Sequence, residues 1–213
     1  DALREAAILS FASLGSLEDV DLKAVRKILI EATRAGDGIA ARYLLAIDRK
    51  VNGETELDYG FPYTVAQDTY SALSTCAKTG SGEAQFELGR YIAHEYVSKK
   101  RKMGGALAKE SERDSALNLL EKAAESGSAE ADFELYKFRK EIEPFRFSNS
   151  PEDKQADISG YHLNRALSRG HVEAALVVGD RMVKEARTRS NFDEGFKLLL
   201  FATKVGVGAA SAT

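Results

Sequence analysis

The sequence has few of the residues that make disulfides, helix kinks or membrane spans. Its 213 residues contain one cysteine, three prolines and no tryptophan. The single cysteine, Cys76, excludes an internal disulfide framework, and three prolines leave long stretches free for helix. No apolar run approaches the roughly 20 residues that a membrane-spanning helix needs, so we expect no membrane span in this portion.

A strong charge of either sign is also missing. The chain has 30 basic and 33 acidic residues, which gives a formal net charge of -3 at pH 7. A charge so close to zero provides no general attraction to nucleic acid or to anionic lipid, so we expect no nucleic-acid partner. With 44% hydrophobic residues, the chain has enough apolar material for a continuous core and is predicted to fold.

Residue patterns that carry catalysis or bind metals are absent as well. The histidines His94, His162 and His171 belong to no H-x-x-x-H pattern, and the lone cysteine forms no C-x-x-C pair, so we predict no zinc site. The sequence has no G-x-S-x-G turn and no Walker loop. Carboxylates such as Glu83 and Glu87 lie one helical turn apart, where charged surface is far commoner than acid–base machinery. We therefore predict that the chain is not an enzyme and binds no cofactor or metal.

One phrase recurs five times along the chain. It consists of a leucine, an alanine or cysteine three residues later, a glycine after four more, and an alanine after a further four. Successive glycines are 44, 47, 43 and 36 residues apart, a period typical of arrays of helix pairs. The five copies are Leu29/Ala32/Gly36/Ala40, Leu73/Cys76/Gly80/Ala84, Leu120/Ala123/Gly127/Ala131, Leu163/Ala166/Gly170/Ala174 and Leu199/Ala202/Gly206/Ala210.

Each copy of the phrase has the spacing of a helix–turn–helix junction. The leucine and the small residue share one helical face, and the glycine supplies the left-handed backbone position that ends a helix. The following alanine then lies in the first turn of the next helix. Cys76 occupies a small-residue position, which predicts a buried thiol. One turn beyond the junction, the apolar stripe continues with Leu44, Leu88, Leu135 and Val178.

Two stretches resemble a known repeat family. The segments EKAAESGSAEADFEL (121–135) and CAKTGSGEAQFELGRY (76–91) are similar to the SEL-like repeat (SLR) family, which is related to tetratricopeptide repeats. The family pattern reads roughly A-A-E-x-G-x-x-x-A-Q-x-x-L-G. The matching residues are Ala77, Gly80, Ala84, Gln85, Leu88 and Gly89 in one stretch and Ala123, Ala124, Glu125, Gly127, Ala131 and Leu135 in the other.

The resemblance implies an all-α fold, a right-handed α-solenoid of stacked antiparallel helix pairs. We expect a single solenoid over residues 1–213 with a leading pair at 1–35, made of helices at 1–13 and 19–35. Repeats are expected to follow at about 37–80, 81–127, 128–170 and 171–206, with a truncated next helix at 207–213. Their helices are predicted at about 39–50, 65–79, 83–98, 113–126, 129–142, 156–169, 172–187 and 192–205.

The resemblance also implies a binding groove, lined by the first helix of each pair. The groove positions lie three, six, ten and fourteen residues after each repeat glycine. Phe86 and Phe133 are the aromatic anchors that a binding surface would use, or else they pack into the neighbouring helix. The groove residues are Glu83, Phe86, Arg90 and His94, then Glu130, Phe133, Lys137 and Glu141, then Glu173, Leu176, Asp180 and Lys184.

Three longer connectors carry individual features. Aromatic residues gather in segments 51–64 and 143–155, where they either pack beneath the loop or present a stacking surface to a sugar ring or peptide. A basic run in segment 98–112 is either a solvated tip or a contact for an acidic polysaccharide or acidic protein. The residues concerned are Tyr59, Phe61, Phe145 and Phe147 and, in the basic run, Lys99, Lys100, Arg101 and Lys102.

The resemblance points to a non-catalytic scaffold that holds partner proteins in a larger assembly. One recurring setting among SLR proteins is bacterial envelope machinery, including periplasmic assemblies for exopolysaccharide secretion. That setting favours a periplasmic or cell-envelope location over the cytoplasmic alternative. An adaptor in signalling or protein quality control is a second interpretation, and a regulatory subunit of an enzyme is a third.

Overall fold

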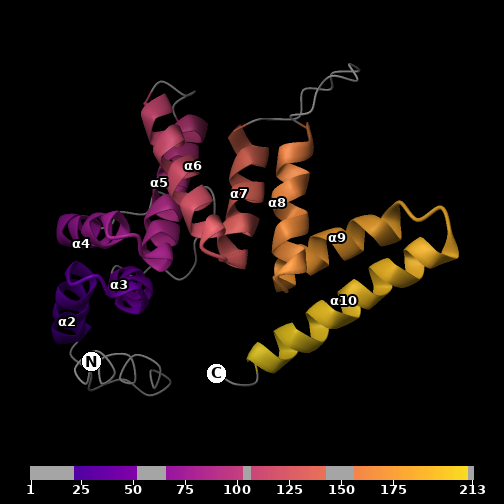
Figure 1. Ribbon diagram of the computed structural model, residues 1–213, viewed down its shortest axis with the longest axis horizontal. Helices are drawn as coiled ribbons and strands as arrows, with labels where there is room; N and C mark the ends of the chain where they lie inside the picture. The colour runs from indigo at the N-terminus through magenta and orange to yellow at the C-terminus, as the bar shows by residue number, and fades with distance from the viewer. Residues whose placement is uncertain (1–21, 52–65, 103–106, 143–155, 211–213) are drawn as a thin grey trace. The chain divides into compact units, whose positions relative to one another are not determined.

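The computed structural model describes residues 22–51, 66–102, 107–142 and 156–210, and every regular element in these ranges is an α-helix (Figure 1). The chain divides into two compact units, Asp1–Ser128 and Ala129–Thr213. The described helices of the first unit are α2 (Leu22–Arg34), α3 (Gly38–Val51), α4 (Gln67–Lys78), α5 (Gly82–Lys102) and α6 (Glu110–Glu125). Those of the second are α7 (Ala129–Ile142), α8 (Ala156–Ser168), α9 (Val172–Lys184) and α10 (Arg189–Ala210).

The expected all-α class of paired helices is confirmed, and the predicted helix ranges agree with most of the observed ones to within a few residues. The largest extensions beyond the predicted ranges are in α5, which continues to Lys102, and in α10, which runs from Arg189 to Ala210. The predicted helix at residues 1–13 lies outside the described residues.

Four of the five repeat glycines end a helix as predicted. Gly36, Gly80, Gly127 and Gly170 have φ angles of 97°, 93°, 106° and 81°, a left-handed conformation that side chains disfavour. At the first of these, the amide of Gly36 donates to the Thr33 carbonyl at 3.0 Å. Such hydrogen bonds satisfy the last carbonyls of the helix and turn the chain back on itself.

The residue after each of these turn glycines stands at the N-terminus of the next helix. Those residues are Asp37, Ser81, Ser128 and His171. A side-chain acceptor at this position satisfies an amide that has no partner inside the helix. Three such bonds join Asp37 Oδ1 to Ala40 N at 3.1 Å, Ser81 Oγ to Ala84 N at 3.3 Å and His171 Nδ1 to Ala174 N at 3.3 Å.

The fifth copy of the phrase is not a junction, and that prediction was wrong. Gly206 lies inside α10, which continues to Ala210, so no new helix begins at residue 207. The residue after Gly206 is Val207, which has no side-chain acceptor to cap a following helix. A glycine alone costs a helix only about 1 kcal/mol, which the neighbouring leucines and Ala202 can offset.

The apolar stripe predicted from the repeat is buried in both units. Leu44, Leu88, Leu135 and Val178 are all core residues. Cys76 is also fully buried, as predicted, and burial raises the pKa of its thiol. One cluster of the first unit joins α2, α3 and α4 through Val25, Leu29, Ile30, Ala40, Leu44, Ile47 and Ala72. A second joins α3, α4 and α5 through Ala41, Leu45, Leu73, Cys76, Ala77, Ala84 and Leu88.

Successive helix pairs of the first unit are also joined by charge. Arg26 on α2 donates from Nε to Asp48 Oδ1 on α3 at 2.5 Å and from NH1 to Asp68 Oδ2 on α4 at 2.9 Å. Its NH2 group reaches Thr69 Oγ1 at 2.9 Å. The face of α2 that contains Arg26 therefore packs on the next helix pair.

Small residues let certain pairs approach closely. A Cβ added at Gly89 on α5 would lie 3.0 Å from Leu119 Cβ and 3.1 Å from the Leu120 amide nitrogen on α6. In the second unit, a Cβ at Gly179 on α9 would lie 2.9 Å from the carbonyl oxygen of Gly195 on α10. These two pairs therefore meet backbone to backbone, and α9 and α10 lie side by side (Figure 1).

Candidate functional site

The predicted groove positions in α5 and α7 form the same local arrangement. The sequences FELGR (86–90) and FELYK (133–137) each place a cation one turn after a phenylalanine. The Arg90 guanidinium lies 5.1 Å from the centre of the Phe86 ring, and the Lys137 ammonium lies 5.4 Å from that of Phe133. Each cation therefore covers the ring of its own helix.

A buried glutamate completes each arrangement. Glu87 Oε2 lies 2.5 Å from Arg90 NH2, and Glu134 Oε2 lies 2.7 Å from Lys137 Nζ. Burial raises the pKa of Glu134 above its usual value, although the charge of Lys137 opposes that shift. Both cations are paired within their own helices, so neither is available as an isolated charge for an acidic ligand. The sequence pattern indicates the phenylalanines and the cations but not Glu134. The expectation that Glu87 lies on a charged surface is wrong, because Glu87 is buried beside Arg90.

The predicted groove residues of α5 and α7 differ in how far they are exposed. Phe86 is 7% exposed and His94 is 4% exposed, so both lie in the interior. Phe133 is half-buried and packs against the core of its unit. Glu83, Glu130 and Glu141 are exposed. The burial of Phe86 agrees with its alternative interpretation as a core residue, and the binding roles of all these residues stay predictions.

The groove positions of α9 have a different character. Glu173, Leu176, Asp180 and Lys184 are all exposed. Lys184 Nζ pairs with Asp180 Oδ2 at 2.7 Å, one turn away on the same helix. An exposed pair of this kind contributes little to stability. This face of α9 is therefore a mixed polar surface with one apolar residue.

The basic run Lys99 to Lys102 lies in the last turn of α5, not in a connector as predicted. Lys99 Nζ lies 3.0 Å from Glu112 Oε1 on α6 and 3.5 Å from Glu95 Oε2 one turn earlier. These contacts hold the end of α5 in helical form against α6, which explains why the helix extends past residue 98. The aromatic connector residues Tyr59, Phe61, Phe145 and Phe147 lie outside the described residues.

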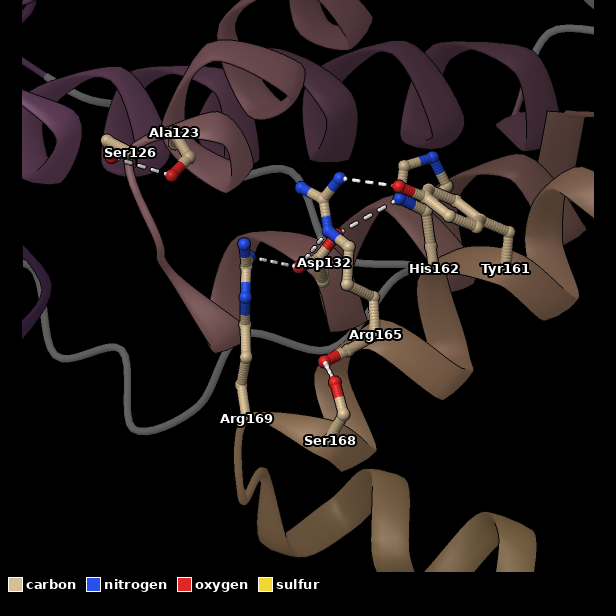
Figure 2. A network of polar contacts seen from close by, with 8 residues as sticks. All are labelled: Ala123, Ser126, Asp132, Tyr161, His162, Arg165, Ser168 and Arg169. Atoms are coloured by element: carbon tan, nitrogen blue, oxygen red, sulfur yellow. Dashed lines mark hydrogen bonds and ion pairs between the residues drawn. The ribbon is translucent and has the colours of Figure 1, made fainter.

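A buried acid is the most concentrated polar feature of the second unit (Figure 2). Asp132 on α7 is fully buried. Its Oδ1 lies 3.1 Å from His162 Nδ1, and its Oδ2 accepts from Arg165 Nε at 2.8 Å and Arg169 NH1 at 2.5 Å. Arg165 also donates to the Tyr161 hydroxyl at 3.0 Å.

The electrostatics of Asp132 favour a structural role. Burial alone would raise its pKa, but hydrogen bonds from His162 and Arg165 and the charges of Arg165 and Arg169 outweigh burial and lower it. Three donors occupy the carboxylate, so it has little capacity left to accept a proton from a substrate. The network was not foreseen, although Asp132 occupies the repeat position of Gln85, which instead donates to the Ala77 carbonyl at 3.2 Å.

The second unit also exposes a stripe of apolar side chains on α10. Phe192, Phe196 and Leu200 recur every four residues and are 45%, 49% and 44% exposed; these three are called the α10 stripe. The rings of the two phenylalanines are stacked, with centroids 6.3 Å apart. Phe201 and Val205 are exposed further along the same helix. An exposed apolar cluster of this kind is typical of interaction surfaces.

Residues of the α10 stripe occupy the same positions in the repeat as residues of α2 that pack on another helix. Counting back from the repeat glycine, positions ten and six are Phe196 and Leu200 in α10 and Arg26 and Ile30 in α2. In α2, Arg26 contacts α4, and Ile30 is buried in the cluster that includes Ala72 of α4. Sequence reasoning missed the stripe, although its spacing of four residues was a readable signal.

The described part of the chain offers no candidate metal site and no candidate membrane span. No group of three or more His, Cys, Asp or Glu side chains in it is placed to hold a metal ion. Among the same residues, no helix is both long and apolar enough to cross a bilayer.

No family model and no curated protein matches this chain. Solved structures do. A Sel1 repeat protein from Oxalobacter formigenes aligns with a TM-score of 0.60 at 16% identity, covering 96% of this chain and 72% of that one. A protective antigen present in uropathogenic Escherichia coli strains, which displays an SLR fold, aligns with a TM-score of 0.58 at 16% identity, covering 94% of this chain and 37% of that one. These likenesses show the fold that the repeat phrase predicted.

Proposed function

We propose that this chain, which has the SLR fold, is a non-catalytic scaffold that binds other proteins through the α10 stripe. The observation that carries the proposal is the exposure of three large apolar side chains in a row on a helix that is already packed on α9 through another face, which contains Gly195, Leu198 and Leu199. Covering such side chains removes apolar surface from water and favours association. The likeness to SLR-fold structures supports a repeat protein as the framework.

The chemistry of the stripe favours a helical partner. In α2 the residues at the same phase pack on helix α4, so the α10 stripe presents the shape that an apolar helix face fits. The exposed charges of α10 are of both signs and include Asp193, Glu194, Lys197 and Lys204, so they do not select a strongly charged ligand. A partner with an amphipathic helix is therefore the expected class.

The test compares two variants in affinity purification with cross-linking from the native host. The first replaces the α10 stripe by serine (Phe192→Ser, Phe196→Ser, Leu200→Ser). The matched control replaces two equally exposed apolar residues of the first unit, Ile39→Ser and Leu107→Ser. We expect the stripe variant to lose the proteins captured by the wild type and the control to keep them. Circular dichroism should show equal helicity in both, and retention of every protein by the stripe variant would contradict the proposal.

A finer proposal concerns the assembly. The SLR resemblance supports an organising role in a multiprotein complex, with periplasmic machinery for exopolysaccharide secretion as the first setting and an adaptor in signalling or protein quality control as the second. The proteins captured by the wild type and lost by the stripe variant distinguish the two. Envelope components would favour the first setting, and kinases, chaperones or proteases the second.

A further inference from the structure

One helix cap differs chemically from the others. Of the four residues that follow a turn glycine, Asp37 is a permanent anion at neutral pH, and Ser81 and Ser128 are neutral. The fourth, His171, is the one residue type of this set whose charge changes between pH 5 and 8. The cap of α9 therefore depends on a proton in a way that the other caps do not.

The geometry requires a neutral His171. Its Nδ1 accepts a hydrogen bond from the Ala174 amide at 3.3 Å, so this nitrogen must present its lone pair, and the ring proton is assigned to Nε2. Ala174 is fully buried. When Nδ1 is protonated it can no longer accept, and the Ala174 amide loses its partner. An unpaired buried amide is unfavourable, and a cation at a helix N-terminus opposes the helix dipole.

The surroundings couple this cap to the predicted groove. The His171 ring is stacked on Phe133 of α7 at a centroid distance of 4.5 Å, and its side chain is 12% exposed. Its charged neighbours are Glu173 on α9, whose Oε2 lies 3.3 Å from Nδ1, and Glu130 and Lys137 on α7. Burial lowers the pKa of His171; the two glutamates oppose that shift and Lys137 adds to it.

We propose that the turn between α8 and α9 is a pH-sensitive joint, in which protonation of His171 releases the cap of α9 and disturbs the contact with Phe133. Imidazolium Nδ1–H then turns from the Ala174 amide toward the Glu173 carboxylate. A partner that contacts Phe133 or the first turn of α9 would lose its preformed surface in mildly acidic conditions. This inference rests on the cap geometry and does not depend on the proposed function of the α10 stripe.

The direction of the effect follows from proton linkage. A histidine whose folded pKa is below its unfolded value of about 6.5 binds its proton more readily when the local structure opens. Opening of α9 is therefore unaffected by this group above neutral pH and becomes easier as the pH falls below about 6.5. Between pH 7.5 and 5.5, one such group increases the opening constant by at most about tenfold.

Two NMR measurements on the full chain test the joint. The first titrates the imidazole nitrogens of His171. It should find the Nε2–H tautomer at pH 7.5 and a pKa below about 6.5. The second measures hydrogen-exchange protection factors for the amides of Ala174 and Ala175 at pH 7.5 and 5.5. The wild type should lose protection at the lower pH by several-fold, up to about tenfold.

Three variants sharpen the second measurement. His171→Ser, which copies Ser81 and Ser128, and His171→Asn each supply a cap that does not titrate and should keep the same protection at both pH values. Glu173→Gln removes the carboxylate that accepts the hydrogen bond from the imidazolium Nδ1–H, and this variant should lose more protection at pH 5.5 than the wild type. A His171 pKa at or above 6.5, or an equal loss of protection in the wild type and in whichever cap variant folds, would overturn the proposal.

Discussion

The α5–α6 and α7–α8 pairs start from the same repeat phrase and are joined in different ways. In α5, position nine after the turn glycine is Gly89, which lets α6 approach within contact distance of the backbone. In α7 the same position is Tyr136, which packs on the apolar core of the second unit and is too large for such an approach. The α7–α8 pair is joined instead by Asp132 and the three donors that surround it.

The contrast shows how few positions decide the type of packing. Between the two first helices, FELGR and FELYK keep the phenylalanine, the buried glutamate and the leucine. At two equivalent positions α5 has Gln85 and Gly89, where α7 has Asp132 and Tyr136. The first two accompany a close backbone contact, and the second two accompany a buried ionic cluster. A buried ionic cluster is more sensitive to the loss of one member than an apolar contact of similar size.

The largest expected effect comes from removing Asp132, the acid that joins α7 and α8. Asp132→Ala should destabilise the second unit by about 3–5 kcal/mol, because it leaves His162, Arg165 and Arg169 without their shared acceptor. Chemical denaturation, monitored by hydrogen exchange of the amides in α7 and α8, measures the loss of stability. The control is Asp114→Ala, a change of an exposed side chain of α6, which should change stability by less than about 0.5 kcal/mol. Equal effects in the two variants would contradict the role assigned to Asp132.

The second prediction concerns the backbone contact. Gly89→Ala should cost the first unit about 1–3 kcal/mol, because the added methyl group meets the Leu120 backbone at 3.1 Å. Gly206→Ala is the matched control, since a Cβ there meets nothing within 4 Å and the residue lies inside a helix. That variant should be stabilised by about 0.5–1 kcal/mol. Thermal melts measure the shift in Tm of each variant relative to the wild type. Shifts of the same sign in both variants would show that α5 and α6 are not in tight contact.

The pH dependence of the two units sharpens the comparison further. The pKa of Asp132 is lowered in the folded state, so its stabilising effect is complete above the usual aspartate pKa of about 3.9 and disappears as the pH falls through the lowered value. Acid should therefore open α7–α8 before α5–α6, because the Gly89 contact of α5–α6 involves no titrating group and its Lys99–Glu112 pair is partly exposed and contributes little. Hydrogen exchange between pH 5 and pH 2 follows both pairs in one sample. Asp132→Asn should remove the difference in acid response.

The smallest expected effect lies at the end of α5. Lys99→Gln breaks the pairs with Glu95 and Glu112, and because these groups are partly exposed the cost should be at most about 1 kcal/mol. Raising the salt concentration to 1 M should weaken the wild type toward the variant. Lys99→Arg keeps the charge and should behave like the wild type. A salt-independent difference between wild type and Lys99→Gln would point to lost packing of the aliphatic stem instead.

The helix junctions could be predicted from the sequence because they depend on residues close together in the chain. The Asp132 network and the Lys99 contact could not, because they depend on residues far apart in the chain. Turn glycines, the apolar stripe and buried Cys76 depend on residues within one or two helical turns, so spacing alone located them. Asp132 meets partners that are 30 to 37 residues away, and no local pattern announces them. Lys99 was assigned to a loop because its partner Glu112 lies across the following connector. The α10 stripe has a helical period, but its phase becomes that of a packed face only through the contacts that α2 makes with α4.

The failed junction at Gly206 has a consequence for how such chains change over time. The four working turns differ from it in the residue after the glycine, which is Asp, Ser or His in place of Val207. A boundary between structural units is then encoded by two adjacent residues, and neither an insertion nor a deletion is needed to create one. Val207→Ser would supply the missing half of that code. Point substitutions can thus redraw where one helix stops and another starts, while chain length and the hydrophobic pattern stay the same.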